Sequence, residues 1–64
     1  MTDTQLLTQL NQHIAELTTL AAKAAQHIPP EPERDDPWLG AWNALGGAVT
    51  ACRQARWMTR QAMR

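Results

Sequence analysis

Serine, tyrosine and phenylalanine are absent from this 64-residue chain, and cysteine occurs once, at Cys52. Without serine or a glycine-rich phosphate loop, the sequence templates of serine hydrolases and of nucleotide-binding enzymes find no match. A single cysteine excludes a disulfide within the chain and is typical of a reducing compartment. A chain this short forms one domain, residues 1–64, with little volume for a preformed substrate pocket. We therefore expect no catalytic activity and no cofactor.

Acidic residues are absent from the second half of the chain. All six acidic side chains lie in residues 1–36, where Lys23 and Arg34 are the basic ones, and residues 37–64 contain four arginines and no acid. The formal charge is 0 overall, but it is 2 − 6 = −4 in the first segment and +4 in the second. Such a separation is typical of a polar contact surface, or of opposite ends that pair in an assembly.

Long apolar runs are absent as well. Residues 37–52 are 16 consecutive uncharged positions before the first arginine of that half. This run is shorter than the roughly 18–20 residues that cross a bilayer, and it includes Asn43 and Thr50. Residues 1–5 lack the basic and apolar regions of a signal peptide. We therefore expect a cytoplasmic protein that does not associate with a membrane.

Proline divides the chain into two helical segments. Three of the four prolines lie in residues 29–32, where they stop a helix. The fourth, Pro37, follows Asp36, and an aspartate N-cap before a proline in the first helical position is a typical helix start. The sequence predicts a helix at about residues 4–28, a stiff connector at 29–36 and a second helix at about 37–62.

Both predicted helices carry a heptad pattern of apolar residues. In the first helix the positions alternate by three and four, at Leu7, Leu10, Ile14, Leu17, Ala21, Ala24 and Ile28. In the second helix the large ones are Trp38, Trp42, Leu45, Val49 and Cys52, beside a strip of small residues at Gly40, Ala44, Gly47, Ala48, Ala51 and Ala55. We assign the large residues of both helices to the core or to a dimer interface.

Gly46 and Gly47 are the weak point of the second helix. Two glycines inside a helix cost roughly 2 kcal/mol relative to alanine, which makes a kink or a break conceivable. The apolar pattern resumes in phase after them. It therefore favours one continuous helix.

The two patterns predict an all-α antiparallel hairpin. Its register places Ile28 near Trp38, and Leu7 near Thr59. One neighbouring helix covers only part of an apolar arc of about 100° or more, and domains of this size commonly need oligomerisation. We expect a homodimer in which two hairpins form a four-helix bundle.

Arginines near the end of the chain form the candidate partner-binding surface. They are spaced by three or four residues along one side of the second helix, with a tryptophan beside them: Arg53, Arg56, Trp57, Arg60 and Arg64. Arginine and tryptophan are enriched at protein interaction hot spots, and they also suit phosphate contact and base stacking. A solvated basic terminus that favours the helix dipole is the simple structural alternative. Because six acids balance the basic residues, nucleic acid is the less favoured partner.

Other residues with reactive side chains have ordinary explanations. His13 and His27 lie on one helix roughly 21 Å apart, and His13 with Cys52 would supply two of the four ligands of a structural zinc site. We therefore predict no metal site. Cys52 is expected to be a small core residue rather than a reactive thiol. The carboxylates of the connector are expected to be solvated, because acid–base catalysis needs them held in a cleft.

Three functional hypotheses remain. The leading one is a small adaptor or inhibitor that binds a host or cognate protein as a homodimer, since stand-alone chains this short are frequent among bacteriophage and mobile-element products with such roles. The second is an RNA- or DNA-binding regulator, because the predicted plan resembles that of the plasmid RNA-binding protein Rop, another dimeric hairpin. That resemblance is one of plan alone, and no motif transfers a residue. The third is a structural subunit of a larger complex.

Overall fold

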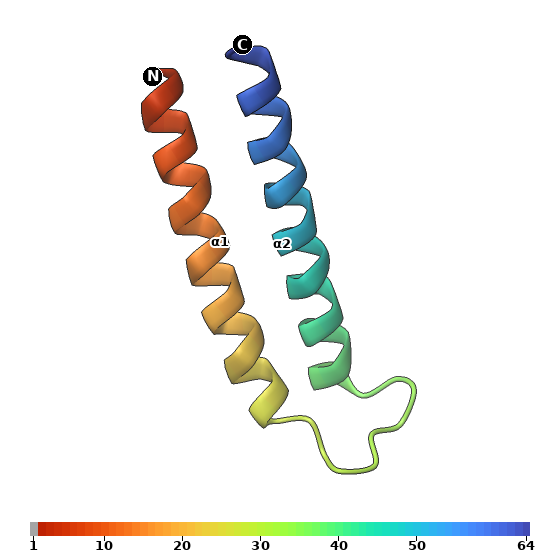
Figure 1. The fold of residues 1–64 in the computed structure, drawn as a ribbon. Coiled ribbons are helices and arrows are strands. Elements are labelled where there is room, and N and C mark those ends of the chain that lie inside the picture. Colours follow the sequence, from red (N-terminus) through yellow and green to blue (C-terminus); the bar gives the residue numbers. More distant parts are fainter. Residues whose placement is uncertain (1) are drawn as a thin grey trace.

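The computed structural model describes residues 2–64 and consists of two antiparallel α-helices joined by one connector (Figure 1). Helix α1 spans Asp3–Gln26 and helix α2 spans Pro37–Ala62. The start of α1 and the end of α2 lie at one end of the hairpin, and the connector lies at the other. The molecule is a rod of 47 × 16 × 14 Å. Residues 2–64 contain no strand, and the predicted all-α hairpin is confirmed.

Side-chain caps determine where both helices begin. Oγ1 of Thr2 accepts the N–H of Gln5 at 3.1 Å, and Oε1 of Gln5 accepts the N–H of Thr2 at 3.0 Å, which completes a capping box. Oδ1 of Asp36 accepts the N–H groups of Trp38 and Leu39 at 2.9 and 3.0 Å. Local sequence signals are therefore sufficient to start each helix.

Helix α1 ends at Gln26 rather than at the expected residue 28. The N–H of His27 donates to the carbonyl of Ala24, and that of Ile28 to the carbonyl of Ala25, so the last bonds span three residues instead of four. Pro29 disfavours the helical conformation at the residue before it. The helix therefore tightens and stops before the proline.

Helix α2 continues through Gly46 and Gly47 without a break, as the apolar pattern predicts. No glycine within residues 2–64 has a positive φ. A β-carbon added at either glycine would meet nothing within 4 Å. Packing within the hairpin therefore does not require glycine at these positions. Neither helix in this part of the chain has an apolar stretch that could span a bilayer.

The core is a narrow seam between the two helices. Its buried residues, among those the structure describes, are Ile14, Ala24 and Val49. The remaining predicted seam positions of the first helix are all half-buried, including Ile28 just after the end of α1, and so are two of those in α2: Leu7, Leu10, Leu17, Ala21, Ile28, Leu45 and Cys52. The heptad pattern of α1 therefore faces α2 along its whole length.

Trp38 and Trp42 lie outside this core. Their exposed fractions are 46 % and 43 %, whereas Leu39 beside them is half-buried. The sequence predicts both tryptophans in the core or at a dimer interface. The structure shows that they are not in the core of the hairpin. The contact that Trp38 makes is with the His27 ring at the end of the first helix, beside the seam and not within it.

Two contacts between the helices establish the register. The His27 ring stacks on Trp38, with centroids 4.2 Å apart and an angle of 20° between the planes. Toward the other end, Nη1 of Arg56 donates a hydrogen bond to Oδ1 of Asn11 at 2.8 Å. The predicted register places residue 27 opposite residue 39 and residue 11 opposite residue 55. Each observed contact lies one position from that pairing.

The hairpin leaves more surface in solvent than a compact protein of its mass. Its accessible surface is 4978 Å². A compact monomer of 7.2 kDa exposes about 4,100 Å². The excess is roughly 900 Å², close to the ~800 Å² that each partner contributes to a standard protein interface.

Candidate interaction surfaces

Two faces of the hairpin flank the seam, one on each side. In an antiparallel heptad pair, corresponding flanking positions of the two helices lie on the same side. The His27–Trp38 stack marks one side, and the Arg56–Asn11 hydrogen bond marks the other. We call the first side the alanine face. In α2 its residues are Ala41, Ala44, Ala48, Ala51, Ala55, Met58 and Ala62, and in α1 they are Leu6, His13, Leu20 and His27, flanked by Gln9, Glu16 and Lys23. We call the second side the arginine face; its residues are Asn11 and Thr18 in α1 and Asn43, Thr50, Arg53, Trp57 and Arg60 in α2.

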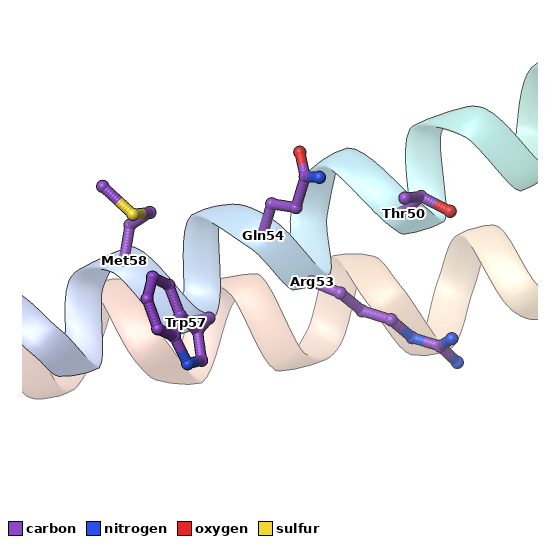
Figure 2. A pocket seen from close by; sticks show the side chains of 5 residues that line it. All are labelled: Thr50, Arg53, Gln54, Trp57 and Met58. Carbon is purple, nitrogen blue, oxygen red and sulfur yellow. The ribbon is translucent and has the colours of Figure 1, made fainter.

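Trp57 is the centre of the arginine face. Its exposed fraction is 59 %, and no aromatic or cationic side chain of residues 2–64 stacks on it. It lines a shallow depression on α2 together with Thr50, Arg53, Gln54 and Met58 (Figure 2). The Arg53 side chain extends away from Trp57, while Met58 projects from the opposite edge of the helix. The indole is therefore open to a partner.

Arg53, Arg60 and Arg64 are exposed. Throughout the described part of the chain, no carboxylate lies within 4 Å of an arginine nitrogen, and the nearest carboxylate contact of a nitrogen side chain is that of Glu16 with Nδ1 of His13 at 3.8 Å. The positive charge of these three arginines is therefore not neutralised within the hairpin.

Arg56 is placed differently from the other predicted arginines. It is half-buried, and its guanidinium donates to Asn11 of α1. The reason is its heptad position: Arg56 follows Val49 by one heptad and therefore faces the seam as Val49 does. A long aliphatic stem suits this position, because it lies along the seam while its charged head reaches the solvent at the edge. The structure therefore groups Arg53, Trp57 and Arg60, and directs Arg56 toward α1.

The other candidate residues do not form a chemical site. The Cys52 thiol is free and half-buried in the seam. No group of three histidine, cysteine or carboxylate side chains in residues 2–64 could hold a metal ion. A second depression, on the outer side of α1, is lined by uncharged threonine and glutamine side chains between Thr4 and Gln12.

Sequence reasoning did not single out Thr50, Gln54 and Met58, which line the depression beside Trp57. The available signal was their spacing of three or four residues around the tryptophan. In the sequence, the small residues of α2 were grouped as one strip. In the structure, Gly40 and Gly47 lie away from the alanine face. No protein family matches this chain, and neither a curated protein nor a solved structure shows significant similarity to it.

Proposed function

We propose that this protein is a small non-catalytic regulator, an adaptor or inhibitor, that binds a host or cognate protein through the arginine face of a homodimer. The observation that carries the proposal is Trp57, exposed at 59 % within a depression that Arg53 also lines. Tryptophan and arginine are the residues most enriched where protein interfaces gain their binding energy. When a partner buries an exposed indole of this kind, the burial contributes a favourable free energy to binding.

The environment of Trp57 favours a protein over a nucleic acid. Uncharged side chains form most of the depression, with Met58 at one edge. Arg56 uses part of its guanidinium for Asn11 and adds little to the face. The chain as a whole has a formal charge of 0, whereas nucleic-acid-binding domains are usually basic.

The homodimer is the second part of the proposal. Three apolar residues form the buried core of the described chain, which is little for an independently stable domain of this length. The surface excess of roughly 900 Å² over a compact monomer matches one side of a standard interface. Two hairpins that pack face to face would bury apolar surface of both copies and form a four-helix bundle.

The experiment is affinity capture from the lysate of the native host, with nuclease treatment before elution. Trp57→Ala and Arg53→Glu should each abolish capture of a defined protein. Gln12→Ala, on the exposed outer side of α1, is the control and should leave capture unchanged. Capture that survives both α2 substitutions would show that the arginine face is not the binding surface.

Nucleic-acid binding would give a different result. A gel shift would be present at about 50 mM salt and would weaken steeply at about 200 mM, because bound arginines release counterions from the phosphates. We expect no shift at either concentration. A structural subunit would instead aggregate or unfold when purified alone, whereas we expect a soluble, well-defined dimer.

A further inference from the structure

We propose that the second copy packs on the alanine face in an antiparallel orientation, so that the acidic connector of each copy lies beside the arginine-bearing end of the other copy's α2. This inference rests on the homodimer of the proposed function and not on its protein partner. It specifies which face of the hairpin the second copy covers, and whether the two copies are parallel or antiparallel.

Composition distinguishes the two faces. In α2 the alanine face consists of alanines and Met58 and carries no charged group. It also holds large apolar side chains with high exposed fractions, among them Leu20 at 48 % and Met58 at 61 %. A symmetric dimer through the arginine face would instead bury the like charges of Arg53 and Arg60, which have no carboxylate within 4 Å in the hairpin. Burying like charges is unfavourable, so the alanine face is the one that a second copy can cover.

Symmetry then determines which helices meet. When two hairpins pack face to face about a two-fold axis with their connectors at opposite ends, α2 lies antiparallel to the α2 of the second copy. If the rods overlap fully, Ala51 lies near Ala48 of the partner subunit, and Met58 near Ala41 of the partner subunit. Alanine on alanine permits the short end of the 8–10 Å range of interaxial distances. Met58 covers the small residues toward each end.

Charge determines the orientation. The connector end carries four carboxylates against Arg34, and the opposite half of the rod carries four arginines against Asp3. The rod is 47 Å long, many times the Debye length of about 8 Å at physiological salt. The two ends of one hairpin therefore hardly interact. An antiparallel copy places opposite charges side by side at both ends, whereas a parallel copy places like charges together.

The first experiment tests the face. Ala51→Glu introduces a charge at an exposed position of the alanine face, and Ala15→Glu introduces the same charge on the exposed outer side of α1. Alanine and glutamate are both good helix formers, so each variant should retain the hairpin. Light scattering should show a monomer for Ala51→Glu and a dimer for Ala15→Glu and for the wild type. A dimeric Ala51→Glu variant would overturn the choice of face.

The second experiment tests the orientation. A spin label is attached at Arg34→Cys in a Cys52→Ala background, which leaves the four connector carboxylates in place. The antiparallel dimer predicts a distance between the two labels comparable to the 47 Å rod length. A distance below half of that length would overturn the antiparallel orientation while leaving the homodimer intact. A monomeric wild-type protein in the first experiment would overturn the homodimer itself.

Discussion

Nη1 of Arg56 lies 2.8 Å from Oδ1 of Asn11, a residue 45 positions away in the chain. This hydrogen bond joins the C-terminal part of α2 to the N-terminal part of α1 and lies at the opposite end of the seam from the His27–Trp38 stack. It also removes Arg56 from the arginine face. A residue that resembled a binding determinant in the sequence thus helps to align the two helices.

We expect a measurable coupling between Arg56 and Asn11. A double-mutant cycle of Asn11→Ala and Arg56→Ala, followed by urea unfolding, should give an interaction free energy of about 0.5–1 kcal/mol. The bond lies at an exposed edge, which keeps the value small. The cycle is needed because Asn11→Ala alone also gains helix propensity. The same cycle with Gln12→Ala in place of Asn11→Ala should give no coupling, and equal values in the two cycles would contradict the role of this bond.

Asp36 should contribute more to stability than its neighbour Asp35. Its carboxylate caps α2 by accepting two backbone N–H groups, and the loss of such a cap costs about 1 kcal/mol. Asp36→Ala should therefore lower the midpoint of thermal unfolding by roughly 4–8 °C, at matched protein concentration. Asp35→Ala is the control, and similar shifts for the two variants would show that local charge rather than capping is responsible.

Alanine at Gly46 or Gly47 should stabilise the hairpin. Both positions are helical, and an added β-carbon meets nothing within 4 Å. Each substitution should raise the free energy of unfolding by about 1 kcal/mol. Gly40→Ala, also with open space around it, should behave in the same way. A loss of stability at Gly46 or Gly47 would mean that another chain lies against that side of α2 in solution.

Salt should weaken the homodimer. In the antiparallel arrangement, acidic connectors lie beside arginines, and added salt screens this attraction. The dissociation constant from sedimentation should therefore rise between low and high sodium chloride concentrations. The charges are exposed, so the change should be modest. A dissociation constant that falls with salt is the signature of like charges in contact, as in the parallel arrangement.

The start of each helix, the end of the second and the inner side of α1 were determined by the sequence alone, whereas α1 ends two residues before the predicted position. The signals for them are local: the Asp36-Pro37 start, the prolines of the connector and the regular three-four spacing of leucine, isoleucine and alanine along α1. These signals act within one or two helical turns, so they do not depend on what the helix packs against. The register could be predicted to within one position because a hairpin with one connector leaves little freedom.

Only the tertiary structure decided which of the large predicted positions of α2 are buried against α1 and which are not. Large apolar side chains occur on more than one side of this helix, so the pattern fits several rotations about its axis. Trp38 and Trp42 lie at the surface, while Leu45, Val49 and Cys52 lie in the seam together with the aliphatic stem of Arg56. Packing depth is a property of both helices together, and the sequence of α2 therefore could not reveal it.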